Sequence, residues 1–133
     1  MVGKTKLPLR EEHKKIIDEY LKRENALGSE VERLLEALAP IDVHWKLVRD
    51  QFFETVYDHL DDVERARHTE QAAYKKIFCF MAVHGIGMRP HTPEEAATKL
   101  GGSPKTVRNC ELRFRKRLQE RVENAMKREL RRK

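Results

Sequence analysis

Apolar residues recur every three or four positions through most of the chain, which is the spacing of one face of an α-helix. Shorter repeats predict helices at about residues 8–26 and 31–38, and residues 70–84 are apolar on most sides, which predicts the most buried helix. A third helix, at about 42–63, has an apolar face that we expect in the core, with a partner-binding groove as the alternative for its aromatic residues: Trp45, Val48, Phe52, Val56, Leu60 and Val63, widened by Phe53 and Tyr57. The pattern predicts an all-α protein.

Helix start and stop signals are densest in residues 85–104. Thr92-Pro93-Glu94-Glu95 combines a capping threonine, a proline at the first helical position and a glutamate that completes a capping box. Gly101-Gly102 ends this short helix, and Ser103-Pro104 starts another that meets no breaker before the chain ends. Two helices joined by a short turn that contains glycine have the outline of a helix-turn-helix.

The side chains of these two helices divide into an inner and an outer set. The inner set is small or apolar and is predicted to form a shared core: Ala96, Ala97, Leu100, Val107 and Cys110. The outer set is polar and is predicted to read base edges in a DNA major groove: Lys105, Thr106, Arg108, Asn109 and Arg113. Lys and Arg match the acceptors of guanine, and Asn matches the donor and acceptor of adenine. Phosphate contacts are predicted for four further residues: Ser103, Arg115, Lys116 and Arg117.

The positive charge is concentrated at this end of the chain. The net charge is +6, and charged residues make up 38% of the chain, compared with roughly a quarter in an average soluble domain. Residues 105–133 contain twelve Lys and Arg and four acidic residues, whereas the remaining 104 residues carry a net charge of −2. This asymmetry points to a polyanionic partner, and a merely solvated helix face is the alternative.

A family resemblance rests on residues 94–101 and 103–109, which follow one another as helix, turn and helix. This stretch resembles the DNA-binding domain of LuxR/GerE-type regulators and is similar to region four of bacterial sigma factors. Residues 77–85 resemble the helix that precedes the motif in sigma factors, and the resemblance spans about residues 70–120. It implies a transcription regulator that reads double-stranded DNA with the helix from Ser103.

The chain departs from this pattern in ways that limit what the resemblance implies. Pro104 and Lys105 replace the Arg-Glu pair typical of primary sigma factors. Residues 1–68 show no convincing sigma region two, so the resemblance implies a regulator and not a complete sigma factor. We therefore divide the chain into an N-terminal helical region, 1–68, for packing, dimerisation or partner binding, and a DNA-binding domain, 69–133, that ends in a long basic helix.

A further apolar stripe follows the long C-terminal helix: Phe114, Leu118, Val122, Met126 and Leu130. One interpretation is the seam of a homodimer, which we favour because DNA-binding helix-turn-helix modules commonly pair. The alternative is packing against the N-terminal helices, because steps of four do not sustain a coiled coil.

Other chemistry receives little support from the sequence. Cys79 and Cys110 lie in apolar runs and are expected to be buried free thiols. We expect the protein to be in a reducing cytoplasm and to be of bacterial or phage type. The spacing of Cys79, His84 and His91 matches no zinc site, and no nucleophile, phosphate loop or carboxylate pair indicates an enzyme. We therefore expect no metal and no cofactor. The chain has neither an apolar leader nor a membrane span, so we expect no membrane contact.

Two hypotheses of function follow. The first is a sequence-specific DNA-binding transcription regulator. The second is a sigma-like helical adaptor that binds RNA polymerase or a sigma factor without reading DNA. RNA binding is less favoured, because no aromatic residues alternate with the basic positions to stack on bases.

Overall fold

The computed structural model describes residues 11–23, 30–39, 44–65 and 69–132. They form six α-helices: α1 (Glu11–Lys22), α2 (Val31–Ala37), α3 (Trp45–Glu64), α4 (Glu70–His84), α5 (Pro93–Leu100) and α6 (Pro104–Arg132). This part of the chain is all-helical, as the hydrophobic pattern predicts. The expected ends of the first helix, at residues 8 and 26, lie outside the described residues.

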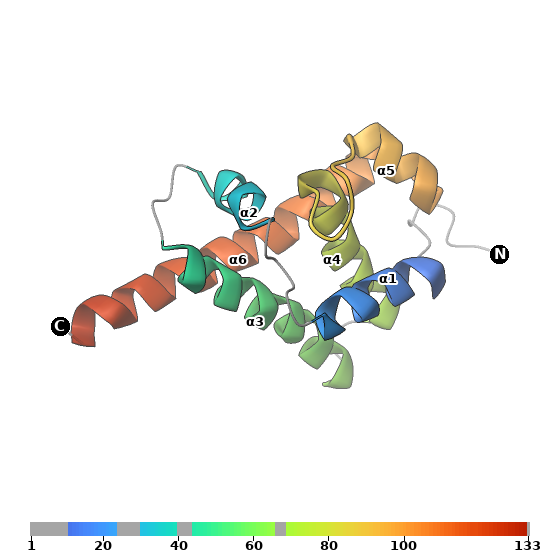
Figure 1. The fold of residues 1–133 in the computed structure, drawn as a ribbon. Coiled ribbons are helices and arrows are strands. Elements are labelled where there is room, and N and C mark those ends of the chain that lie inside the picture. Colours follow the sequence, from blue (N-terminus) through green and yellow to red (C-terminus); the bar gives the residue numbers. More distant parts are fainter. Residues whose placement is uncertain (1–10, 24–29, 40–43, 66–68, 133) are drawn as a thin grey trace.

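The longest helix, α6, crosses the whole molecule, and its C-terminal end extends beyond the other helices (Figure 1). It packs against α3, α4 and α5, so each of these three elements has α6 as a neighbour. Phe114, Leu118 and Val122 on α6 have no solvent exposure, whereas Leu130 is 73% exposed. The middle of α6 is therefore a core helix and its end is a surface helix.

The centre of the core is a cluster of aromatic rings from three helices. The ring of Phe114 lies 4.6 Å from Phe80 on α4 and 5.8 Å from Phe52 on α3, centroid to centroid. His59 of α3 also stacks on Phe114, with the ring centroids 5.1 Å apart. Helix α4 is buried along most of its length, which confirms the expectation that residues 70–84 form the most buried helix.

The favoured interpretation of the C-terminal apolar stripe is wrong for most of its members. Phe114, Leu118 and Val122 are fully buried by the chain itself, and Met126 packs against the same core. The seam that a second copy would need is thus occupied by α3 and α4. One hydrophobic core includes residues from both sides of position 68, from Ile17 to Val122, so the two proposed segments pack as one body.

Two aromatic residues expected in the core lie at the surface. Trp45 is 42% exposed and Tyr57 is 50% exposed, while Phe52 between them is fully buried. Trp45 is the first residue of α3, where its ring is flanked by Lys46 and Arg49, with the cations 5.6 and 5.2 Å from the ring centroid. These cation–π contacts stabilise the indole ring at a solvent-exposed position.

Candidate nucleic-acid interface

Local capping interactions fix the start of α5 and α6. The backbone N–H of Glu95 donates to Thr92 Oγ1 at 3.1 Å, and the N–H of Thr92 donates to Glu95 Oε1 at 3.0 Å, which completes the expected capping box. At the start of α6, the N–H of Thr106 donates to Ser103 Oγ at 3.2 Å. Both helix starts therefore lie where the sequence predicts them.

The turn between the two helices is short and closed by backbone hydrogen bonds. Gly101 has a φ of 79°, a conformation that glycine adopts without steric cost. Its N–H donates to the carbonyl of Ala97 at 2.7 Å, and the N–H of Gly102 donates to the same oxygen at 3.0 Å. Three residues, 101–103, thus separate α5 from α6.

The inner side chains hold α5 against α6. Ala96, Leu100 and Val107 have no solvent exposure, and Ala97 is 3% exposed. Cys110, also expected to face this core, is half-buried and packs against it. The predicted inner set is confirmed, and its burial leaves the opposite side of α6 open to solvent.

That open side carries most of the predicted base-reading residues. Lys105, Arg108, Asn109 and Arg113 are all exposed, within the first three turns of α6. Residues four or eleven positions apart lie on one face of an α-helix, so Lys105, Asn109 and the exposed Lys116 form one line, with Arg108 and Arg113 on its two flanks. The candidate interface is therefore a basic stripe from Lys105 to Lys116, roughly 17 Å long at 1.5 Å per residue.

The stripe ends where acidic side chains take over the same face. Glu120 and Glu123 are both exposed and follow Lys116 along α6. A phosphate backbone would be repelled there, so a polyanion fits only the N-terminal part of the helix. The exposed cations near the C-terminus, Lys127, Arg128 and Arg131, form a separate basic segment.

One flank of the stripe is paired within the chain. Arg108 donates to the carboxylate of Glu94 on α5 at 3.0 Å, and both side chains are more than half exposed. The sequence does not predict this pair, because the two residues lie fourteen positions apart and meet only when α5 packs on α6. The ion pair holds Arg108 toward α5 and places a negative charge beside the stripe.

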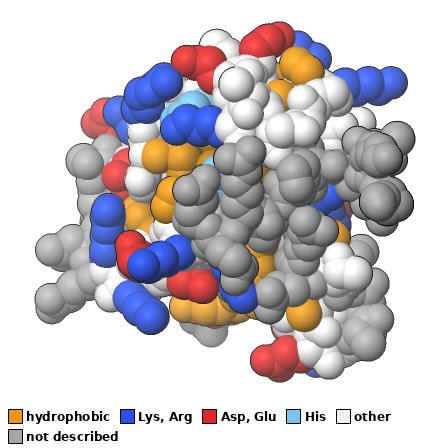
Figure 2. Space-filling view, turned by 90° about the vertical axis from the view of Figure 1, so that its right-hand side faces the viewer, with side chains coloured by type: hydrophobic (Ala, Val, Ile, Leu, Met, Phe, Trp, Pro, Cys, Tyr) orange, Lys and Arg blue, Asp and Glu red, His pale blue; other side chains and the backbone are white. Residues whose placement is uncertain are grey.

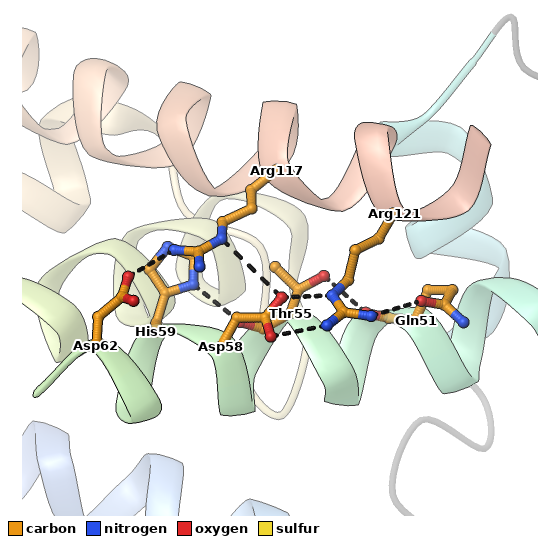
Figure 3. A network of polar contacts seen from close by, with 7 residues as sticks. All are labelled: Gln51, Thr55, Asp58, His59, Asp62, Arg117 and Arg121. Carbon is orange, nitrogen blue, oxygen red and sulfur yellow. Dashed lines mark hydrogen bonds and ion pairs between the residues drawn. The ribbon is translucent and has the colours of Figure 1, made fainter. Parts of the chain in front are cut away.

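Three of the four predicted phosphate contacts have other roles in the structure. The Ser103 hydroxyl caps α6 and also bonds the hydroxyl of Thr106 at 3.0 Å, which leaves Thr106 half-buried beside the stripe. Arg115 donates through Nε to Glu111 at 2.8 Å. Arg117 points away from the stripe toward α3, where it donates to Asp62 at 2.9 Å (Figure 3). Of the four, Lys116 alone stands on the outward line.

Arg117 belongs to an ion-pair network that fastens α6 to α3. Arg121, one turn further on, donates from two nitrogens to the carboxylate of Asp58 and from a third to Gln51 at 3.3 Å (Figure 3). The hydrogen bonds to Asp58 raise the pKa of Arg121. The assignment of Arg117 to phosphate is corrected on this ground: its charge is already neutralised by Asp62 and, at 4.0 Å, by Asp58.

A second buried polar contact fastens α6 to α4. Glu111 is 7% exposed, and its Oε2 lies 2.7 Å from Nε2 of His84. Burial raises the pKa of Glu111, but the hydrogen bonds to His84 and Arg115 outweigh that effect, so the pKa is lower than usual. The carboxylate therefore faces inward and does not repel a polyanion on the outer stripe.

The face of the molecule on the side of α5 does not form one uniform positive field. On the side of the molecule where α5 lies, Lys and Arg side chains are interspersed with Asp and Glu (Figure 2). Within the described residues, no three His, Cys, Asp or Glu side chains are grouped to hold a metal ion. None of the described helices combines the length and apolar character needed to cross a bilayer.

Comparison with known proteins adds no assignment to this geometry. No protein-family model, no curated protein and no solved structure matches the chain.

Proposed function

We propose that the chain is a sequence-specific DNA-binding transcription regulator, with α5 and α6 as the helix-turn-helix and the first three turns of α6 in the major groove. The observation that carries this proposal is the outward line of Lys105, Asn109 and Lys116, with Arg108 and Arg113 beside it. An α-helix fits the major groove, and these side chains match the edges that purines present there.

The packing of α6 supports the same proposal. The inner side of the basic segment is anchored by Val107 and Phe114, both fully buried, so the outer side chains project from a rigid element. Side chains that read bases need such a scaffold, because a helix that moves loses the geometry of bidentate hydrogen bonds. We assign the phosphate contacts to Lys116 and to the backbone N–H groups at the capped start of α6.

Selection of bound duplexes from a random pool tests the proposal. We expect enrichment of a defined sequence, whose affinity falls steeply with salt because bound phosphates release counterions. Each phosphate that a Lys or Arg side chain neutralises is expected to contribute about −0.9 to the slope of log K against log salt. Absence of any duplex binding at low salt, with retention on RNA polymerase instead, would favour the adaptor hypothesis.

Two single variants separate base reading from phosphate contact. Asn109→Ala is expected to cost about 1–3 kcal/mol on the selected sequence and to relax the preference at one base pair. Lys116→Ala is expected to weaken all duplexes alike and to reduce the salt slope by about one. Fluorescence anisotropy at several salt concentrations measures both, and Lys22→Ala on α1 is the matched control for loss of an exposed charge. Equal behaviour of all three variants would contradict the assigned face.

The Glu94–Arg108 ion pair leads to a prediction of opposite sign. Glu94→Gln removes a negative charge beside the stripe and releases Arg108, so duplex affinity is expected to rise about 3- to 10-fold at low salt. Titration against the selected duplex and a random duplex measures the change. Glu19→Gln, which removes an exposed carboxylate on α1, is expected to leave affinity unchanged. Weaker binding by the Glu94 variant would show that this carboxylate orients Arg108 productively.

A homodimer remains a prediction, but it needs a surface other than the buried part of the apolar stripe. The selected sequence reports on it directly, since a dimer with two-fold symmetry reads a palindrome with half-sites about one helical turn apart. A single asymmetric site would indicate that one chain binds alone.

A further inference from the structure

The two cysteines of the chain meet across the interface between α4 and α6. Cys79 is fully buried and immediately precedes Phe80, and Cys110 lies one helical turn before Phe114. The rings of Phe80 and Phe114 are 4.6 Å apart, so these two positions are brought to the same crossing of the helices. There the Cys79 thiol is a hydrogen-bond donor to the sulfur of Cys110.

The surroundings of the pair differ on its two sides. Cys79 is enclosed by the core, whereas the Cys110 residue is half-buried and partly exposed. The positive charges of Lys75, Lys76 and Arg113 act on Cys110. The hydrogen bond from Cys79 lowers the pKa of Cys110 to about 7 against the opposing effect of burial, and the three cations act in the same direction. The same hydrogen bond, with burial, raises the pKa of Cys79.

We propose that Cys79 and Cys110 are a redox-active pair, which a hydroperoxide oxidises to an intramolecular disulfide that joins α4 to the first turns of α6. A thiolate that is both accessible and flanked by cations is the form of cysteine that reacts with peroxides. A second thiol in contact with it can attack the sulfenic acid that forms and convert it to a disulfide. The inference does not depend on DNA binding.

The chemistry balances in two steps. The Cys110 thiolate attacks one oxygen of hydrogen peroxide, the O–O bond breaks, and hydroxide leaves and takes up a proton as water, so Cys110 becomes a sulfenic acid. The sulfur of Cys79 then attacks the sulfur of Cys110, the S–O bond breaks, and the departing hydroxide takes the thiol proton of Cys79 as a second water. Two thiols lose two electrons and two protons in all, and the peroxide is reduced.

Mass spectrometry of the whole, reduced chain after treatment with hydrogen peroxide tests the proposal. We expect a monomer lighter by two hydrogen atoms that resists alkylation under denaturing conditions, with a cross-linked peptide containing both cysteines. The bridge closes a loop of about 30 residues, so the melting temperature is expected to rise by about 5 °C or more. Before oxidation, iodoacetamide is expected to modify Cys110 at least about 10-fold faster than Cys79.

Single variants identify the two roles. In the Cys79→Ser variant, oxidation by peroxide is expected to stop at a sulfenic acid on Cys110, which dimedone traps. In the Cys110→Ser variant, Cys79 is expected to stay reduced. The measurement on the wild-type chain tests the proposal even if a variant folds poorly. Full alkylation of both residues after peroxide, covalent dimers through Cys110 instead of the internal bridge, or direct over-oxidation of Cys110 to a sulfinic acid would each overturn the proposal.

Discussion

Replacing Phe114 with alanine is expected to lower the free energy of unfolding by about 3–5 kcal/mol, the range typical of a fully buried phenylalanine. The ring contacts Phe80, Phe52 and His59 from two different helices, at centroid distances of 4.6 to 5.8 Å. Its removal leaves a cavity that α3, α4 and α6 all line, so no single helix can close it by a small shift. Among single substitutions in this core, we expect it to be one of the most damaging.

Denaturant unfolding of the wild type and of Phe114→Ala measures this effect, and Tyr57→Ala is the control. Tyr57 is aromatic and lies on α3, but it is 50% exposed, so its loss is expected to cost less than about 1 kcal/mol. Because Phe114 packs within the chain, the unfolding midpoint of a wild-type monomer is expected to stay constant over a roughly 100-fold range of protein concentration. A midpoint that rises with concentration would instead show that a second copy stabilises the folded chain, through this core or through another surface.

The sequence predicts those features of the fold that depend on neighbours along the chain. The caps at Thr92 and Ser103, the glycine turn between them and the inner face of Ala96, Leu100 and Val107 all follow from signals within a few residues. Helix existence is predicted for the same reason, because a period of three to four positions is a local property. The exposed stripe of the candidate site belongs to this group, since it is the opposite side of a predicted inner face.

Features that depend on which helix meets which could not be predicted in this way. Phe114, Leu118 and Val122 in the apolar stripe of α6 are buried, as their spacing predicts. The spacing does not identify their partner, because a homodimer seam and an intramolecular core have the same periodicity. From the sequence, Arg117 is assigned to phosphate because it lies in a basic run, whereas in the structure α3 packs on α6 and places Asp62 beside it. The expected burial of Trp45 is wrong for a related reason. Its spacing fits the core face, but it is the first residue of α3 and is 42% exposed.

The arrangement of α6 links the proposed interface to stability. One side of its first three turns carries the exposed basic stripe, while the other side supplies Val107, Glu111 and Phe114 to the protein's interior. A substitution on the inner side is therefore expected to reduce DNA binding only through loss of folded protein. Affinities of such variants need to be compared with their folded fraction, whereas those of the stripe variants do not.

Acidification is expected to destabilise the protein through His59. Its ring is 2% exposed, and its Nδ1 lies 2.9 Å from the carbonyl of Thr55, a contact that fits the neutral ring as a donor. Burial lowers the pKa of His59 from 6.5 to about 4. The hydrogen bond to Thr55 and the nearby Asp62 oppose this shift, while the positive charges of Arg117 and Lys76 strengthen it.

The direction of the pH effect follows from which state binds the proton. Between pH 6.5 and about 4 the unfolded chain protonates this histidine and the folded chain does not, so stability falls as the pH falls. At 1.36 kcal/mol per unit of pKa, the contribution is about 2 kcal/mol between pH 7 and pH 5, and it approaches about 3 kcal/mol near pH 4. Above pH 6.5 both states hold a neutral ring, and the contribution vanishes.

Urea unfolding at intervals from pH 7.5 to pH 5 measures this dependence, in a range where ordinary carboxylates stay ionised. His59→Gln keeps a donor within reach of the Thr55 carbonyl but cannot be protonated, so its stability is expected to fall by about 2 kcal/mol less than that of the wild type over this range. The difference between the two slopes isolates His59 from the other histidines. Parallel slopes, or an NMR titration in which the His59 ring charges near pH 6.5, would show that the folded protein accommodates the imidazolium and that its burial costs nothing.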